Sequence, residues 1–178
     1  MRLYVTRHGR TEWNRLNKAL GRTDIPLDEL GIQQAHELAA ALAGEPIDLA
    51  LCSPLSRART TCEIVCSELD VPWSVCPELI EHNFGIFEGV DRADPVYQHE
   101  KRRYFARFEG GESFLDVAAR VYPLLDRLQA EHPGEGVLLV AHTGIARVVC
   151  SYFCPMENEE FFNFQLDNCG VLRFDCQG

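Results

Sequence analysis

Val-Leu-Leu-Val-Ala-His-Thr-Gly, residues 137–144, is the stretch of sequence that decides the fold. Its first five residues form an unbroken apolar run, which is typical of a central strand in a parallel sheet covered on both faces. A helical pattern follows almost at once, from about residue 145 to residue 153. A strand that leads directly into a helix is the repeating unit of an α/β fold, so this stretch predicts one.

The rest of the chain continues this alternation. Strands are predicted at residues 2–6, 47–52 and 72–76, helices at 28–43, 56–69 and 113–131, and one helical turn at 11–16. Asp28 is a suitable N-cap and Gly44 a suitable residue to follow the helix between them. Residues 83–111 are rich in glycine with a charged helical piece near 95–107, and the tail at 162–175 is predicted as two strands around 167–170. We expect one domain over residues 1–178, a three-layer α/β/α fold with a mostly parallel central sheet.

The composition narrows the class of protein. The 178 residues carry a formal net charge of −10, and 46% of them are apolar. An acidic chain is a poor partner for nucleic acid or anionic membranes, so neither is expected. The apolar run at the N-terminus is too short for a signal peptide, and no stretch approaches the roughly 18 apolar residues of a membrane span. We expect a cytoplasmic protein, whose oligomeric state the sequence leaves open.

The eight cysteines raise the question of disulfides or metal. Cys62 and Cys66, and likewise Cys150 and Cys154, are four residues apart on predicted helices. Structural zinc sites usually have closer pairs, and disulfides belong to secreted proteins. We therefore expect free thiols that pack as small apolar groups.

Three predicted strands end in residues that suit phosphate chemistry. Arg7-His8-Gly9 follows the first strand, Ser53-Pro54-Leu55-Ser56-Arg57 the second, and His142-Thr143-Gly144 the apolar strand. In open α/β sheets, ligands bind at the carboxyl ends of the strands. An arginine fork matches phosphate oxygens, glycines allow backbone N–H groups to approach an anion, and a histidine nitrogen can act as a covalent nucleophile. The pattern predicts a phosphoryl-transfer site.

Two other readings of these residues stay open at this point. A single histidine at a strand end is usually a polar surface or core residue, and a single arginine is usually a solvated charge. A pair of histidines could also bind metal, although metal ligands normally include carboxylates or cysteines nearby. Here the neighbours are arginines, which would repel a cation. It is the convergence of several such segments that favours phosphate.

The chain resembles the histidine phosphatase superfamily, in the branch that contains cofactor-dependent phosphoglycerate mutases and small phosphatases. Six blocks carry the resemblance, in order along the chain: Arg7 to Asn14, Gly21 to Leu27 with Gly31 and Gln34-Ala35, Ser53 to Ala58 with Thr61, Glu81 to Gly85 with Glu88-Gly89, Gly111-Glu112-Ser113, and Val140 to Gly144. An Arg-His-Gly triplet alone is a weak signal. Six ordered blocks that span almost the whole chain are specific.

The resemblance implies a role for each residue of the site. His8 would attack phosphorus and become phosphohistidine, while Arg7, Arg57 and His142 would hold the phosphoryl oxygens. Glu81 would protonate the leaving oxygen and then deprotonate water. Further donors would come from Asn14 and from backbone N–H groups near Gly21 and Thr143. No metal and no cofactor are implied, apart from the bisphosphorylated primer that a mutase would need.

The expected function is hydrolysis of a small phosphorylated metabolite. The alternatives are a cofactor-dependent phosphoglycerate mutase and, from a different class, a catalytically silent binding module. Position 10 is arginine where the mutases commonly have glutamate, and the interval from Glu81 to Glu112 is short for a mutase. Small members of the family include broad-specificity and alpha-ribazole phosphatases. Residues 83–111 are expected to cover the active site.

Lys101, Arg102, Arg103 and Arg107 form a basic cluster within that segment. A charged run of this kind is usually a solvated helix face. The alternative is a wall over the pocket that meets a carboxylate or second phosphate of the substrate, with Arg103 as a test position.

Overall fold

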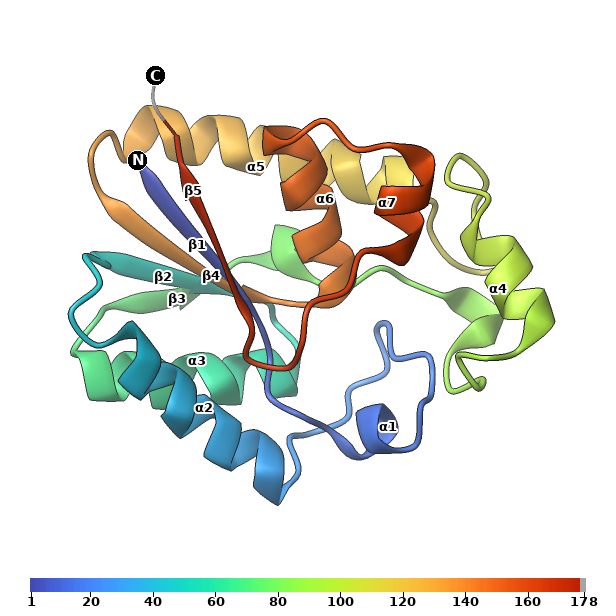
Figure 1. Ribbon diagram of the computed structural model, residues 1–178, viewed down its shortest axis with the longest axis horizontal. Helices are drawn as coiled ribbons and strands as arrows, with labels where there is room; N and C mark the ends of the chain where they lie inside the picture. Colours follow the sequence, from blue (N-terminus) through green and yellow to red (C-terminus); the bar gives the residue numbers. More distant parts are fainter. Residues whose placement is uncertain (177–178) are drawn as a thin grey trace.

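The computed structural model of the protein describes residues 1–176 (Figure 1). Its elements in chain order are β1 (Arg2–Arg7), α1 (Glu12–Arg15), α2 (Glu29–Leu42), β2 (Leu49–Cys52), α3 (Ser56–Leu69), β3 (Trp73–Val75), the 3-10 turns η1 (Pro77–Leu79) and η2 (Gly85–Phe87), α4 (Pro95–Lys101), α5 (Phe114–Glu131), β4 (Gly136–Ala141), α6 (Thr143–Phe153), α7 (Asn158–Asn163) and β5 (Val171–Asp175). The domain predicted over 1–178 includes residues 177 and 178, which lie outside the described part.

Five strands form one sheet in the order β3-β2-β4-β1-β5. β4 pairs in parallel with β1 and β2, and β2 in parallel with β3, while β5 runs antiparallel to β1. β4 contains the apolar run that opened the sequence analysis, and all six of its residues are buried. A strand with two neighbours and two covered faces needs apolar side chains in both directions, which explains the run.

Helices cover both faces of the sheet, with α2 and α3 below it and α5 and α6 above it in Figure 1. Successive residues of the central strands point to opposite faces and so divide between two cores. Leu3 and Leu139 pack with α5 and α6, whereas Tyr4 and Leu138 pack with α2 and α3. The predicted α/β/α architecture with a mostly parallel sheet is confirmed.

Local capping explains where the long helices begin. The Asp28 side chain accepts a hydrogen bond from the Gly31 N–H at 2.8 Å, so the predicted N-cap is confirmed. Ser113 and Asp116 form a reciprocal capping box at the start of α5. Such caps satisfy backbone N–H groups that have no partner inside the helix.

Two predicted elements differ from the structure. The helix expected near 95–107 ends at Lys101, and residues 102–107 form turns. The tail has one strand, β5, instead of two, because residues 158–163 form α7. In residues 164–170, the carbonyls of Phe164 and Leu166 accept hydrogen bonds from Arg147 and Arg7. Both arginines line the pocket described below. The alternation of apolar residues in the sequence gives no indication of these contacts.

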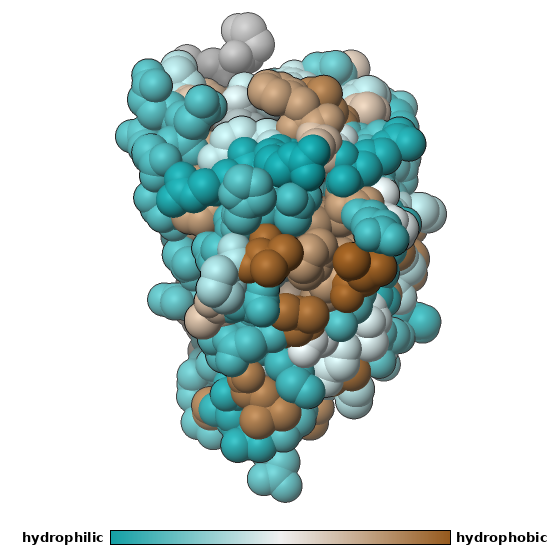
Figure 2. Space-filling model, turned by 90° about the vertical axis from the view of Figure 1, so that its right-hand side faces the viewer, coloured by the Kyte–Doolittle hydropathy of each residue, from teal (hydrophilic) through white to brown (hydrophobic). Residues whose placement is uncertain are grey.

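The segment from 83 to 111 packs around a small core of its own. Tyr97 and Phe108 are buried there with Ala19, and Phe84 and Phe87 pack against them. Figure 2, viewed from the side of α4, shows apolar side chains gathered within a hydrophilic rim. This segment is therefore held to the N-terminal loop by aromatic contacts.

All eight cysteines are free; Cys52, Cys62, Cys66 and Cys76 are buried as expected of thiols that pack as small apolar groups, whereas Cys154 is exposed. No helix within residues 1–176 has both the length and the apolar character needed to cross a membrane.

Candidate active site

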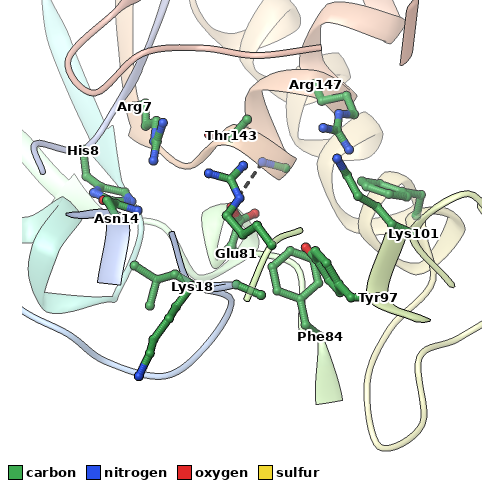
Figure 3. A pocket seen from close by; sticks show the side chains of 15 residues that line it. Arg7, His8, Asn14, Lys18, Glu81, Phe84, Tyr97, Lys101, Thr143 and Arg147 are labelled. Carbon is green, nitrogen blue, oxygen red and sulfur yellow. Dashed lines mark hydrogen bonds between the residues drawn. The ribbon is translucent and has the colours of Figure 1, made fainter. Parts of the chain in front are cut away.

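A pocket of about 50 Å³ opens at the carboxyl ends of β1 and β4 (Figure 3). Its wall consists of Arg7, His8, Asn14, Lys18, Ala19, Leu20, Glu81, Phe84, Arg92, Tyr97, Lys101, Phe114, Thr143, Gly144 and Arg147. We call the part around Arg7, His8 and Glu81 the inner end. The part around Arg92, Tyr97, Lys101 and Arg147 is the outer end.

His8 stands at the inner end with one free ring nitrogen. It is 3% exposed, and its backbone N–H donates to the Ala141 carbonyl at 3.0 Å, which ties it to the end of β4. Its Nδ1 lies 2.7 Å from the Gly9 carbonyl oxygen. Since a carbonyl can only accept, the proton belongs on Nδ1 and the lone pair on Nε2. Burial, with Arg57 and Arg7, holds the pKa of His8 well below its ordinary value, so the ring is neutral.

Arg7 and Arg57 bring positive charge to His8. Arg57 is fully buried, and its two terminal nitrogens donate to the Thr23 and Gly21 carbonyls at 2.9 and 2.6 Å. Carbonyl groups fix the position of a guanidinium but do not neutralise it. Burial lowers the pKa of Arg7 to about 10, which still leaves it charged at neutral pH.

His142 lies beside His8, as the sequence predicts. The two ring centroids are 5.1 Å apart at an angle of 60°. His142 is fully buried, and its Nε2 is 2.7 Å from the Ser53 hydroxyl, which follows β2. The ends of β1, β2 and β4 therefore meet as expected. His142 and Arg57 lie behind the pocket wall, next to His8.

Glu81 reaches the pocket from the loop after η1. It is 4% exposed; its Oε1 accepts from the His82 N–H at 2.8 Å and its Oε2 from the Gly144 N–H at 3.1 Å. Burial raises its pKa despite these hydrogen bonds. A carboxyl group with a raised pKa can give up a proton and take one back near neutral pH.

The predicted neutral donors have different outcomes. Asn14 and Thr143 line the pocket, the latter at the N-terminus of α6, where helix N–H groups favour an anion. Gly21 does not line it. Its N–H donates to the Glu88 carboxylate at 3.2 Å, and the N–H groups of Arg22 and Thr23 do the same. The expectation for Gly21 is corrected, because a side-chain anion already occupies these donors.

Three buried nitrogens near His8 have no hydrogen-bond partner within residues 1–176: Nε of Arg7, Nε of Arg57 and Nδ1 of His142. An unsatisfied buried donor costs about 1–3 kcal/mol, and more when charged. An anion with several acceptor oxygens would satisfy such donors. Among the same residues, no group of three or more His, Cys, Asp or Glu side chains could hold a metal ion.

The sequence model of the Histidine phosphatase superfamily (branch 1) matches residues 3–178. The chain belongs to this superfamily. The Adenosylcobalamin/alpha-ribazole phosphatase of Salmonella typhimurium is 33% identical to this histidine phosphatase domain, over all of this chain and 92% of its own length. A Yersinia pestis protein with the name "Probable phosphoglycerate mutase" is 28% identical, over 99% and 86% of the two chains.

Solved structures of histidine phosphatases agree with this assignment. The mycobacterial glucosyl-3-phosphoglycerate phosphatase complexed with VO3 superposes with a TM-score of 0.86 at 28% identity, covering 97% of this chain and 91% of the other. The alpha-ribazole phosphatase of Shigella flexneri has a TM-score of 0.84 at 29% identity, over 99% and 91%. The family resemblance seen in the sequence is thus confirmed.

Sequence reasoning missed one residue that holds the inner end of this histidine phosphatase together. Asn168 Nδ2 donates to the His8 carbonyl at 2.9 Å and to Asn14 Oδ1 at 3.3 Å. The same loop supplies the Leu166 carbonyl, which accepts from Arg7 at 2.8 Å. The only signal for Asn168 in the sequence is the Asp-Asn-Cys-Gly stretch at 167–170, which by itself predicts a turn between two strands.

The outer end was also missed, apart from the basic cluster. Arg147 lies one turn into α6 and is 4% exposed, and Arg92 and Tyr97 come from the segment 83–111. A buried arginine within an apolar helix was the available signal for Arg147.

The basic cluster divides into two kinds of residue. Three of its members form ion pairs at the surface, which agrees with the interpretation of the cluster as a solvent-exposed charged run. The pairs are Arg102–Glu159, Arg103–Glu100 and Arg107–Asp116. Lys101 instead lines the pocket. Of the four residues, Lys101 lies where a pocket wall would require it, whereas Arg103, the test position, does not line the pocket.

Proposed function

We propose that the protein is a phosphatase that hydrolyses a small phosphorylated metabolite through a phosphohistidine at His8. The observation that carries the proposal is the free Nε2 of a neutral, buried His8 beside Arg7 and Arg57, each of which has an unpartnered Nε. The phosphatase names of the relatives from Salmonella typhimurium and Shigella flexneri support hydrolysis of a small substrate.

In the first half-reaction, Nε2 of His8 forms a bond to phosphorus as the bond to the leaving oxygen breaks. Glu81 gives its proton to that oxygen, which leaves as an alcohol. Arg7 and Arg57 balance the negative charge that spreads over the three phosphoryl oxygens in a loose transition state, and His142, which burial keeps neutral, offers a hydrogen bond from its ring.

In the second half-reaction, water attacks the phosphohistidine. Glu81, now a carboxylate, takes a proton from the water as its oxygen bonds to phosphorus and the P–N bond breaks. The electron pair returns to Nε2 of His8, inorganic phosphate is released, and Glu81 is again protonated. The Gly9 carbonyl holds the proton of Nδ1 in place through both steps.

The test is to locate the covalent phosphate. The enzyme is mixed with a phosphorylated substrate, denatured in base and digested, and the phosphate is assigned by mass spectrometry. We expect an acid-labile, base-stable phosphate on His8. Phosphate on a serine or on His142 would overturn the assignment.

We propose that this reaction needs no metal. The pocket supplies arginine charge where a metallohydrolase would supply a metal ion. Activity should survive EDTA, and vanadate should inhibit by binding at the inner end. Loss of activity in EDTA that zinc or magnesium restores would contradict this.

A mutase is the alternative that the same chemistry allows. It must protect its phosphohistidine from water until the phosphoryl group returns to an acceptor. The segment 83–111, which we propose as the cover of the site, is short, and the pocket at its outer end meets a second, larger cavity. Water can therefore reach the intermediate. With 3-phosphoglycerate and a trace of the bisphosphate, phosphate release should exceed isomerisation; isomerisation faster by about tenfold would favour the mutase.

We place the protein in the cytoplasm, where thiols stay reduced. Its eight free cysteines fit that compartment. Subcellular fractionation of the native organism would test this, and recovery outside the cytoplasmic fraction would contradict it.

A further inference from the structure

Ser53 is a buried polar residue next to the active site that the reaction above does not use. Its backbone N–H donates to the Val140 carbonyl at 3.0 Å, and its Oγ lies 2.7 Å from Nε2 of His142. Both Ser53 and His142 are fully buried. A residue that follows β2 is thus tied at two points to the end of β4, and its hydroxyl group is held against the His142 ring.

The Ser53 hydroxyl group has two hydrogen-bond neighbours within residues 1–176. One is the Leu55 N–H, which donates to Oγ at 3.3 Å, and the other is Nε2 of His142. A backbone N–H can only donate, so it cannot accept the hydroxyl hydrogen. An imidazole nitrogen without a hydrogen can accept it. His142 is therefore the one acceptor that the described part of the chain offers to this hydroxyl group.

The hydrogen bond between Ser53 and His142 has two directions to choose from. If Nε2 donated to Oγ, the hydroxyl hydrogen and the lone pair on Nδ1 of His142 would both lack a partner. If the hydroxyl donates to Nε2, the ring hydrogen lies on Nδ1, and this N–H is the one group left without a partner. Buried polar groups without partners are costly, so the second direction is favoured.

The remaining Nδ1–H of His142 lies in surroundings that suit a phosphoryl group. The ring centroid is 5.1 Å from that of His8, and Nε of Arg7 and Nε of Arg57 are likewise buried without partners among residues 1–176. Burial, followed by Arg57, holds the pKa of His142 well below its ordinary value, so the ring carries one hydrogen and not two. Phosphoryl oxygens at His8 would supply the acceptor that Nδ1–H lacks.

We propose that Ser53 is a positioning residue: its hydroxyl group donates to Nε2 of His142, keeps the ring hydrogen on Nδ1, and so makes His142 a neutral hydrogen-bond donor to a phosphoryl oxygen. The identity of that oxygen rests on the proposed phosphatase function, whereas the tautomer does not. The two rings then differ in what they present. The Gly9 carbonyl leaves His8 with a lone pair at Nε2 for attack, and Ser53 leaves His142 with an N–H for binding.

Nuclear magnetic resonance of the full chain, labelled with ¹⁵N in its histidines, reads the tautomer directly. A ring nitrogen without a hydrogen resonates far from one that carries a hydrogen, and the His142→Gln variant identifies the His142 signals by difference. At neutral pH and without ligand, we expect hydrogen on Nδ1 and none on Nε2. Hydrogen on Nε2, alone or on both nitrogens, would overturn the inference, because the hydroxyl could then only accept.

Variants show whether Ser53 is the cause. Ser53→Ala removes the donor and should bring a measurable population with hydrogen on Nε2, whereas Ser53→Thr keeps the hydroxyl group and should keep the wild-type tautomer. Ser151→Ala is the matched control, since it removes a serine hydroxyl that donates to the Val148 carbonyl within α6, and the His142 signals should stay. Circular dichroism checks that each variant folds. An unchanged tautomer in folded Ser53→Ala would overturn the role of Ser53.

Binding of orthovanadate, measured by calorimetry, tests the hydrogen bond to the anion without turnover. Its Kd should rise about tenfold in Ser53→Ala and little in Ser53→Thr or Ser151→Ala, because one donor to the anion is lost. An unchanged Kd in Ser53→Ala would overturn the donor role. If wild type hydrolyses phenyl phosphate with hydrogen on Nε2 of His142, the inference falls and the phosphatase stands. The expected tautomer in a protein that hydrolyses no phosphomonoester would support the role of Ser53 and overturn the phosphatase.

Discussion

The two ends of the pocket hold positive charge in different ways. At the inner end, Arg57 is fully buried and bound to two backbone carbonyls, and His8 is fixed by the carbonyl of Gly9. At the outer end, Arg147 is buried and bound to the Phe164 carbonyl, but Lys101 rests on an aromatic ring and is partly exposed. Backbone contacts fix atoms to within the distances that bond formation needs, whereas a long side chain on a ring provides charge with a less defined position. The inner end is therefore suited to chemistry, whereas the charge of Lys101 at the outer end is held less precisely.

The largest expected effect is at the centre of the inner end. His8→Ala should lower kcat by about 10⁴-fold or more on every substrate, because no other group offers the covalent route. Steady-state assays with phenyl phosphate and with 3-phosphoglycerate would measure it. His99→Ala, which removes an exposed histidine of α4, is the control and should keep full activity. A rise in KM with kcat unchanged would mean that His8 acts in recognition.

Glu81→Gln should have a smaller effect that depends on the leaving group. An amide cannot supply the proton, so alkyl phosphates should lose about 10²–10³-fold in rate. A nitrophenyl phosphate, whose leaving group needs no proton, should lose much less in the first half-reaction. Single-turnover kinetics on both esters would show the difference, and equal losses would argue against Glu81 as the acid.

The stability of the fold should also depend on pH, with opposite windows for the buried histidines and for Lys101. Burial lowers the pKa of His8, His82 and His142, that of His82 to about 4. The unfolded chain therefore binds more protons than the folded chain below pH 6.5, so stability is full above that pH and falls as the pH decreases, by about 2 kcal/mol per imidazole at pH 5. Lys101, with a pKa of about 8, adds stability only as the pH rises from 8 toward 10.5.

Urea unfolding at pH 7.5 and pH 5.0 would measure this acid dependence. Glu81 has the opposite sign, because its raised pKa favours folding at low pH and this contribution is lost as the pH rises through that value. His82→Gln should reduce the loss between the two pH values by roughly one imidazole's share. Equal free energies of unfolding at both pH values would contradict the prediction.

The smallest effect concerns the loop that supports the inner end. Asn168→Asp keeps the shape of the side chain but cannot donate to the His8 carbonyl, so kcat should fall by about tenfold, with KM changed little. Asn158→Ala, an exposed position on α7, is the control. An effect on KM alone would contradict this prediction.

Much of the fold was predictable because the spacing of apolar residues along the sequence shows which face of a helix or strand is buried. The apolar run of β4, the helical face of α2 and the N-cap at Asp28 are each local signals, and each was confirmed. The first of the two strands predicted in the tail is absent, because an apolar residue such as Phe162 suits either a strand or a helix. The Glu157–Glu160 capping box favoured the helix there.

The inner end was predictable from sequence because its residues follow strands, and strand ends meet at one edge of the sheet. The outer end was not, since its members come from a loop, a short helix and an apolar helix. Gly21 was assigned wrongly for a related reason. Glu88, which binds its N–H, lies far along the chain, and only the fold brings the two together.

The pairing of β1 with β4 also affects when the protein can fold during its synthesis. Arg7 is in register with Ala141, so His8 and His142 can meet only when the first strand has found a partner that lies over one hundred residues later in the chain. During synthesis on the ribosome, most of the protein must be made before this parallel pair can form. A nascent chain therefore holds His8, the proposed nucleophile, in a segment that cannot yet bind phosphate, and we expect activity to begin only when β1 has paired with β4.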